Sequence, residues 1–189
     1  MSEIKLTKLS KIISHALRHD PASYNLELDN DGWVKVGDLI NSLRDLDIGF
    51  KNLSQSDLEN MIESSEKKRH EIFEDRIRAS YGHSVKNKIF KEAEMPPEYL
   101  FHATKKSFLK KIFSKGLLPM KRQYVHLSKN ECDAIKVALR KTKEPILLRI
   151  KSHDAFNNGI KFYKEANNMW LADEIDAVFI EEVEIKQSL

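Results

Sequence analysis

Arg18 and His19 stand side by side in the segment ALRHDP, where an amphipathic run near the N-terminus ends. His15 shares their helical face, at i, i+3 and i+4 spacing. Cationic side chains in a last turn complement the helix dipole, and that role alone would explain them. An arginine fork can also hold two phosphate oxygens at once. A metal site at His15 and His19 is the weaker reading, because no H-E-x-x-H pattern accompanies them.

The segment RIRASYGHS carries the next candidate, Arg78. Arg76 and Arg78 flank Ile77 in a predicted strand, so both project from the face opposite Ile77. We interpret Arg76 as a solvated surface residue and Arg78, which small residues and Gly82 follow, as a candidate anion ligand. Basic residues lie nearby in the sequence: Lys67, Lys68, Arg69, Lys86 and Lys88. This local excess favours a nucleic-acid surface, although charged runs are often only solvated.

In the second half, FHAT places His102 and Thr104 on one side of a strand end, and YVHLS does the same for His126 and Ser128. A single histidine in a strand is usually structural, and Ser128 could serve as a helix N-cap. Two such pairs in one small domain favour a polar ligand held by several converging donors and acceptors. Arg140 ends the helix that Ser128 is predicted to begin, where it could complement the helix dipole.

The elements that must position these side chains fall into two groups. In the first half, periodicity predicts a helix over Ser2–His19, ended by Asp20-Pro21, and a second helix over Asp38–Leu46. A third helix begins at a capping box formed by Ser56 and Glu59. A short strand at Trp33 precedes the second helix, and a β-hairpin turns at Glu74-Asp75. Three short helices followed by a hairpin are typical of a winged-helix module.

A Pro-Pro pair predicts a domain boundary near Met95 to Glu98. Beyond it, YLFHAT, QYVHLS, PILLRI, IKFYKE and DAVFIEEVEI are predicted strands, and KKSFLKKIFSKG is a predicted helix closed by Gly116. A further helix is expected in SKNECDAIKVALRKT, with a capping box formed by Ser128 and Glu131. This half is therefore α+β and rich in strands. It contains neither GxGxxG nor GxxxxGK[ST], so any nucleotide binds by another route.

Composition restricts the class of protein further. The chain has 189 residues, 41% of them hydrophobic, which suits one medium domain or two small ones with buried cores. Its net charge of +3 permits a nucleic-acid partner without requiring one. The single cysteine, Cys132, excludes an internal disulfide and suits a reducing compartment. No apolar stretch approaches a membrane span, so we expect a cytoplasmic protein and, by default, a monomer.

The motifs together resemble a known family. LSKIISHALRHDP, DGWVKVGDLI, RIRASYGHS, PPEYLFHAT, GLLPMKRQYVHLS, KVALRK and MWL occur in this order along nearly the whole chain. They are similar to the RNA 2′-phosphotransferase family, the KptA-like enzymes related to the eukaryotic tRNA-splicing 2′-phosphotransferase. The resemblance implies an α+β protein with a winged-helix RNA-binding lobe over residues 1–94. It also implies a lobe of the ADP-ribosyltransferase fold that binds NAD, over residues 95–189.

The resemblance implies a two-step reaction on an RNA with an internal 2′-phosphate. The phosphate attacks the nicotinamide ribose of NAD+, nicotinamide leaves, and an RNA-phospho-ADP-ribose intermediate forms. A ribose hydroxyl then attacks the phosphorus, which releases 2′-OH RNA and ADP-ribose 1″,2″-cyclic phosphate. The residues implied around the phosphate are Arg18, His19, Arg78 and Arg140, and those implied for NAD binding are His102, Thr104, Arg122, His126 and Ser128. No metal is implied.

The sequence departs from the family pattern at three positions. Glycine is expected where Ala103 stands, glutamine where Tyr81 stands and often serine where Lys121 stands. Two alternative functions remain open from sequence. One is an ADP-ribosyltransferase that stops after the first step and caps nucleic-acid phosphate ends, and the other is a winged-helix nucleic-acid-binding protein without catalysis. Release of nicotinamide would distinguish an enzyme from a binding protein, and the products would distinguish the two enzymes.

Overall fold

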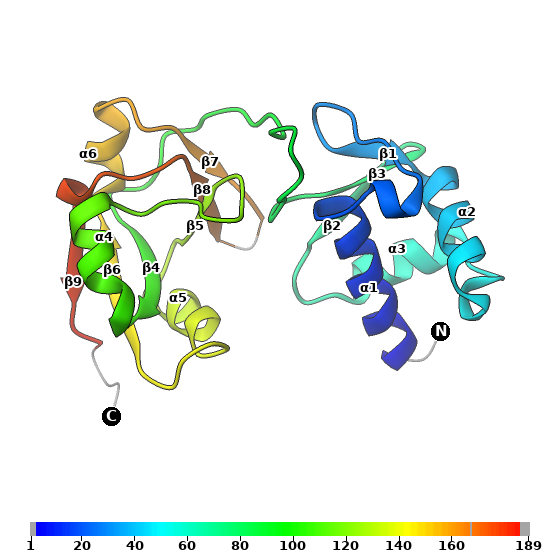
Figure 1. Cartoon of the computed structure of the whole chain (residues 1–189), viewed down its shortest axis with the longest axis horizontal. Coiled ribbons are helices and arrows are strands. Elements are labelled where there is room, and N and C mark those ends of the chain that lie inside the picture. Colours follow the sequence, from blue (N-terminus) through cyan, green and yellow to red (C-terminus); the bar gives the residue numbers. More distant parts are fainter. Residues whose placement is uncertain (1–2, 167, 186–189) are drawn as a thin grey trace. The chain divides into compact units, whose positions relative to one another are not determined.

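The computed structural model describes residues 3–166 and 168–185, and the chain divides into two compact units, residues 1–90 and 91–189 (Figure 1). Each unit has its own cluster of buried apolar side chains. The segment at the start of the second unit is fixed to that unit, since the Glu94 N–H donates to the Phe162 carbonyl over 2.8 Å. The protein is thus a mixed α+β protein with two separate cores.

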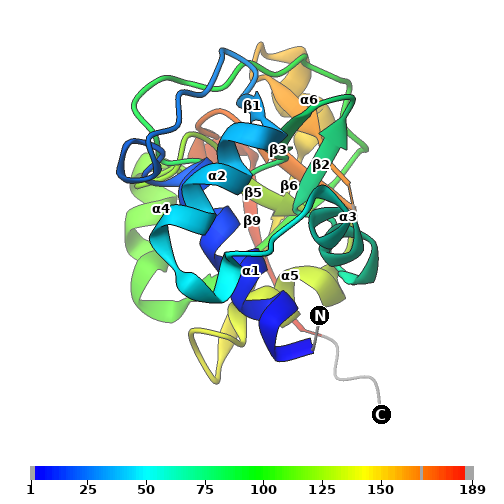
Figure 2. The ribbon, with the colours of Figure 1, turned by 90° about the vertical axis from the view of Figure 1, so that its right-hand side faces the viewer.

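The first unit combines helices with a small antiparallel sheet of order β1-β3-β2. In chain order, its elements are α1 (Glu3–Arg18), η1 (Ala22–Tyr24), β1 (Trp33–Lys35), α2 (Val36–Leu46), η2 (Ile48–Phe50), α3 (Gln55–Ser64), β2 (His70–Phe73) and β3 (Arg76–Ala79). Helix α1 packs against α3 and β3 (Figure 2). This arrangement confirms the predicted helices and hairpin.

The apolar stripe of α1 explains why this helix forms and where it lies. Leu9, Ile13, Ala16 and Leu17 are completely buried, and burying a leucine or isoleucine stabilises a fold by about 1.5–3 kcal/mol. The helix ends at Arg18, two residues before Asp20-Pro21, as the proline predicts. The position of Arg18 at this end is therefore fixed by packing and by the proline together.

The second unit is built on a six-stranded antiparallel sheet of order β7-β8-β5-β4-β6-β9. Its elements are β4 (Leu100–Lys105), η3 (Lys106–Phe108), α4 (Leu109–Lys115), β5 (Val125–Ser128), α5 (Glu131–Ala138), β6 (Pro145–Ile150), α6 (Ser152–Asn157), β7 (Phe162–Lys164), β8 (Met169–Ala172), η4 (Ala177–Phe179) and β9 (Ile180–Val183). Side chains of α4 and α6 pack into one cluster with alternate strand residues such as Leu100, Leu127 and Leu148. One face of the sheet is thus a core face.

Two predicted capping boxes are wrong. The N-cap of helix α3 lies two residues earlier than predicted: its box is Ser54 with Asp57, whose carboxylate accepts from the Ser54 N–H over 3.0 Å. Helix α5 is capped by Asn130, whose side-chain oxygen accepts from the Asp133 N–H over 2.9 Å. Ser128 remains in β5, because an asparagine two residues later performs the same capping chemistry. Ser128 is thereby left available for other contacts.

Sequence periodicity also missed two elements. Strand β8 (Met169–Ala172) and helix α6 (Ser152–Asn157) are only four and six residues long, and so short a segment shows little period. Strand β8 is buried on both sides, and its Trp170 belongs to the apolar cluster of this unit. Phe162 and Tyr163 of β7 are buried as well, so these aromatic side chains serve packing.

Candidate active site

The end of α1 is joined to the loop of residues 80–84, which follows β3. The Ser84 N–H donates to the Arg18 carbonyl over 2.8 Å, and the Ser84 hydroxyl is 2.9 Å from Nδ1 of the exposed His19. His83, which precedes Ser84 in the GHS segment, is buried at 3% exposure. The fold thus brings together the two segments, RH and GHS, that are 65 residues apart in sequence.

Arg18 is buried at 9% exposure even though it carries a charge. Its Nη2 donates to the Arg69 carbonyl over 3.1 Å, and its guanidinium lies 5.1 Å from the centre of the Tyr81 ring. Gly82 has a φ of +90°, and a Cβ added there would lie 3.6 Å from Nη1 of Arg18. Tyr81 therefore supports the arginine through a cation–π contact.

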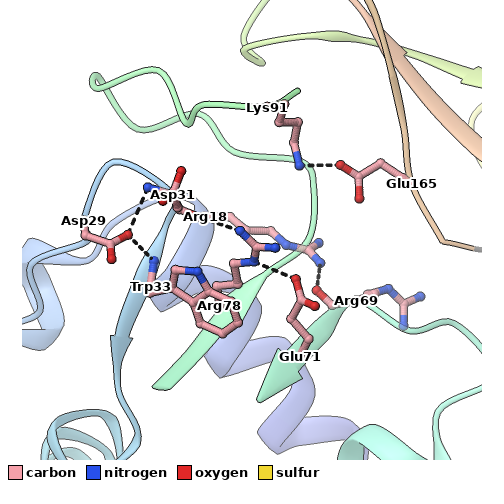
Figure 3. A network of polar contacts seen from close by, with 9 residues as sticks. All are labelled: Arg18, Asp29, Asp31, Trp33, Arg69, Glu71, Arg78, Lys91 and Glu165. Atoms are coloured by element: carbon pink, nitrogen blue, oxygen red, sulfur yellow. Dashed lines mark hydrogen bonds and ion pairs between the residues drawn. The ribbon is translucent and has the colours of Figure 1, made fainter. Parts of the chain in front are cut away.

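Arg78 is held by three groups of the first unit (Figure 3). Its Nε donates to the Glu71 carboxylate over 2.6 Å, and its Nη1 donates to the Asp31 carbonyl over 3.2 Å. The guanidinium lies 4.4 Å from the centre of the Trp33 ring. Among the residues that the structure describes, none accepts a hydrogen bond from Nη2 of Arg78. These three contacts fix the orientation of the Arg78 guanidinium, and its Nη2 can donate to a ligand.

The turn that supplies the Asp31 carbonyl is itself rigid. The Asp29 carboxylate accepts from the N–H groups of Asp31 and Trp33 over 2.9 and 2.8 Å. Gly32 has a φ of +82°, a conformation that favours glycine. The segment Asp29–Trp33 thus places both a carbonyl and an aromatic ring against Arg78.

The motifs in the sequence did not indicate the partners of the arginines, which are Glu71, Trp33 and Tyr81. Glu71 could have been found, because a hairpin that turns at Glu74-Asp75 pairs residues 71 and 78 across the two strands, and this pair is observed. Trp33 pairs with Arg78 from the other side of β3. No local pattern indicates that pairing, since β1 lies more than 40 residues away in the chain.

In the second unit, β4 and β5 are joined much more loosely than their neighbours. Strand β4 pairs with β6 at every position from Leu100 to Lys105, but the only described pair between β4 and β5 is Phe101 with Ser128. The His102 imidazole instead meets β5, with Nδ1 3.0 Å from the His126 carbonyl. A side chain of β4 and a backbone carbonyl of β5 therefore add a second connection between the two strands.

The four polar residues of these strands are arranged on two sides. Residues directly opposite in a ladder share a face, so His126 and Ser128 lie on the side of Phe101, and His102 and Thr104 lie on the other side. All four are partly exposed. They flank the interrupted ladder, and the His102 contact with the His126 carbonyl connects the two pairs.

Both histidines have a hydrogen bond that selects a tautomer. Nδ1 of His102 faces the His126 carbonyl, and Nδ1 of His126 is 3.1 Å from the Tyr124 carbonyl. A carbonyl only accepts, so each Nδ1 carries the proton and each neutral ring has its acceptor at Nε2. Burial lowers the pKa of His102, which favours its neutral form at pH 7.

The remaining predicted residues are exposed loop residues of the second unit. Arg122 follows a tight turn in which its N–H donates to the Pro119 carbonyl over 3.1 Å. Arg140 lies two residues beyond α5 and is exposed. Arg18, His19 and Arg78 belong to the first unit, whereas Arg140 and the five residues predicted to bind NAD belong to the second.

The described residues include neither a candidate metal cluster nor a membrane-spanning helix. No group of three or more histidine, cysteine, aspartate or glutamate side chains among them could hold a metal ion. No helix in residues 3–166 and 168–185 is long and apolar enough to cross a membrane.

Comparison with known proteins gives a consistent answer over nearly the whole chain. Residues 5–174 match the family described as RNA 2′-phosphotransferase, Tpt1 / KptA family. A probable RNA 2′-phosphotransferase of Bacillus thuringiensis subsp. konkukian is 50% identical over 92% of this chain and 94% of its own. Similar proteins with the same description occur in Acetivibrio thermocellus, at 46% identity over 94% of this chain and 97% of that protein, and in Thermococcus kodakarensis, at 33% over 89% and 92%.

Proposed function

Because this chain belongs to the RNA 2′-phosphotransferase, Tpt1/KptA family and is therefore a transferase, we propose that it removes an internal 2′-phosphate from RNA by transfer to NAD+. The proposed products are 2′-OH RNA, nicotinamide and ADP-ribose 1″,2″-cyclic phosphate, formed by way of an RNA-phospho-ADP-ribose intermediate. The finer fold assignment belongs to the same proposal: a winged-helix lobe over residues 1–94 and an ADP-ribosyltransferase-like lobe over residues 95–189.

The observation that carries the proposal is the pre-positioned pair of cations in the first unit. Arg18 is held by the Arg69 carbonyl and the Tyr81 ring, and Arg78 is held by Glu71, Asp31 and Trp33. Cations fixed in advance stabilise a reacting phosphate more than mobile ones, because they need not reorganise during the reaction. An arginine that only contacts solvent would need neither set of contacts.

Each cation has a task in both proposed steps. In the first step, Arg18 and Arg78 orient and partly neutralise the 2′-phosphate so that one of its oxygens can attack. In the second step, negative charge builds on the equatorial phosphoryl oxygens, and the same cations stabilise it. The resemblance to the family implies a phosphate contact for Arg140 as well. His19, oriented by the Ser84 hydroxyl, contacts the phosphate and can move a proton near neutral pH.

We assign NAD+ binding to the second unit. The interrupted ladder between β4 and β5 is flanked by the imidazoles of His102 and His126 and the hydroxyls of Thr104 and Ser128. Such groups can bind the amide and hydroxyl groups of a nicotinamide riboside, and Arg122 can bind a phosphate. When bound, NAD+ supplies the ribose carbon that accepts the phosphate. The departing nicotinamide is a neutral ring that leaves a cationic glycoside, so no general acid is needed.

The proposal is tested by incubating the protein with an oligonucleotide that carries one internal 2′-phosphate, with and without NAD+. We expect phosphate loss and nicotinamide release only when NAD+ is present. Accumulation of ADP-ribosylated RNA as the final product would support the capping alternative. Absence of nicotinamide release with tight RNA binding would support a non-catalytic binding protein.

Glu71 is expected to act as a positioning residue for Arg78. Glu71→Ala removes the acceptor of Nε, so the guanidinium loses its fixed orientation and kcat/KM should fall about tenfold. Glu71→Gln keeps an acceptor oxygen and should recover most of this loss. Steady-state kinetics on the 2′-phosphorylated oligonucleotide measure both variants, with Glu63→Ala on the exposed side of α3 as control. An increase in kcat/KM for Glu71→Ala would instead make Glu71 a competitor of the phosphate.

A further inference from the structure

The second unit contains a long segment without acidic residues. Residues 99–130 include eight of the 32 basic side chains and none of the 29 acidic ones. The rest of the chain therefore holds 24 basic and 29 acidic side chains and is net negative. The mild positive charge of the whole protein conceals this concentration of charge in one segment.

Most of these cations gather on η3 and α4. We call the lysine face the exposed side chains of Lys105, Lys106, Lys110, Lys111 and Lys115. Lysines 106 and 110 are one helical turn apart, as are lysines 111 and 115, so they form two rows along the same segment. From Lys106 to Lys115 the face extends about 14 Å at the rise of an α-helix. The other side of α4 packs into the sheet through Leu109 and the buried Ile112.

The lysine face is not neutralised by carboxylates. Among the described residues, none of its five lysines forms an ion pair, whereas cations elsewhere do: Lys8 with Asp47, Arg76 with Asp29, Arg149 and Lys151 with Glu181, and Lys164 with Glu94. A set of unpaired like charges repels itself. The unpaired charges of the lysine face would therefore be neutralised by an anionic partner.

Two aromatic rings interrupt the lysine face. Phe108 is 51% exposed and Phe113 is 41% exposed. Phe108 is three residues before Lys111, and Phe113 is three residues after Lys110, so each ring lies next to a cation on the helical surface. Lysines combined with exposed rings are the means by which proteins bind single-stranded nucleic acid, since the rings stack on bases while the cations contact phosphates.

We propose that the lysine face, with Phe108 and Phe113, is a second RNA-binding surface that contacts nucleotides flanking the 2′-phosphate. The inference rests on the proposed function for its choice of partner. A membrane surface fits less well, because α4 has only seven residues and its apolar side is already committed to the core. The lysine face would add affinity for a long RNA without touching the reacting phosphate.

The contribution of the lysine charges to RNA binding is tested with the double variant Lys110→Gln/Lys111→Gln. The control is Lys161→Gln/Lys164→Gln, which removes the same charge from exposed positions in and beside β7. The probe is a fluorescent 20-nucleotide single-stranded RNA without a 2′-phosphate, titrated at several salt concentrations. We expect the first variant to bind about threefold to tenfold more weakly, and the salt slope to fall by about 1.4, at roughly 0.7 per phosphate contact. Equal affinity and slope for both variants would overturn the proposal.

The stacking contribution is tested separately. Phe108→Ala/Phe113→Ala should weaken RNA binding about fivefold or more, while the salt slope stays that of the parent protein because no charge is removed. The same four lysine and phenylalanine positions are then tested with vesicles of phosphatidylcholine and phosphatidylserine. A loss of vesicle binding without a loss of RNA binding would assign the surface to membranes and overturn the proposal.

Turnover separates this inference from the proposed function. With a 2′-phosphorylated trinucleotide, Lys110→Gln/Lys111→Gln should have the parental kcat/KM, and with a 20-nucleotide substrate its kcat/KM should fall in step with binding. If the parent protein removes no 2′-phosphate from either substrate, the proposed function fails, and the titrations with unphosphorylated RNA still decide whether the lysine face binds RNA. If turnover is normal and the lysine variant loses no affinity, only the lysine face is refuted.

Discussion

Replacement of Arg78 by alanine is expected to slow the turnover of a 2′-phosphorylated oligonucleotide about 100-fold or more. The variant loses one fixed hydrogen-bond donor to the negative charge that develops in the transition state. Removal of a single donor of this kind lowers kcat about 100-fold to 1000-fold. The second step should suffer most, because charge accumulates on the phosphoryl oxygens there. RNA joined through its phosphate to ADP-ribose should therefore accumulate, and quenched-flow separation of the RNA species measures it. We expect the same behaviour for Arg140→Ala.

The matched control is Arg76→Ala. Arg76 projects from the same strand two residues earlier, forms an ion pair with Asp29 over 3.5 Å and also lies near the Trp33 ring. It shares the charge and the setting of Arg78 but not the clamp by Glu71 and Asp31, so its loss should change turnover less than threefold. Circular dichroism should show both variants folded, since a surface ion pair contributes about 1 kcal/mol or less. Parental rates for Arg78→Ala and Arg140→Ala would refute the phosphate assignment.

Acidification is expected to destabilise the first unit through His70. This histidine is buried at 4% exposure, and its Nε2 is 3.0 Å from the Ser14 hydroxyl of α1. Burial, reinforced by the charges of Arg18 and Arg69, lowers its pKa to about 3. Below pH 6.5 the unfolded chain therefore takes up a proton that the folded unit does not. The free energy of unfolding should fall by about 2 kcal/mol between pH 7 and pH 5 and continue to fall toward pH 3.

His70→Gln isolates this effect. Glutamine keeps a group that can hydrogen-bond to Ser14 and does not titrate, so the pH dependence between 6.5 and 4.5 should flatten relative to the parent protein. Hydrogen exchange of peptides from α1 and β3 reports the first unit separately from the second. The comparison concerns slopes, so a constant loss of stability in the variant does not affect it. Parallel slopes for parent and variant would show that His70 is not the group responsible.

Several parts of the site follow from sequence because the controlling interactions are local. Pro21 ends α1 at Arg18, and the apolar stripe of α1 fixes the side of the helix on which Arg18 lies. The hairpin turn at Glu74-Asp75 fixes the register of β2 and β3, and strand alternation puts Arg78 opposite the face of Ile77. Glu71 as its partner follows from the same register.

Short elements and caps were harder to predict because several residues can perform the same local chemistry. Ser54 and Ser56 could both begin α3, and Ser128 and Asn130 could both begin α5. The observed N-caps are Ser54 and Asn130, where the backbone geometry required of an N-cap agrees with the tertiary packing. Strand β8 has no period of its own and is a strand because β5 and β7 lie on either side of it.

The sequence by itself determined the residue types of the site, the ends of the elements that carry them and, through the order of its motifs, the family. Only the tertiary structure decided which groups hold those residues. Ser84 on His19, Tyr81 beneath Arg18 and Trp33 beneath Arg78 join positions that are distant in the chain. Such contacts leave no local pattern, because they form only when separate elements pack around a shared core. In ALRHDP the chain supplies the cations, and the fold fixes their orientation.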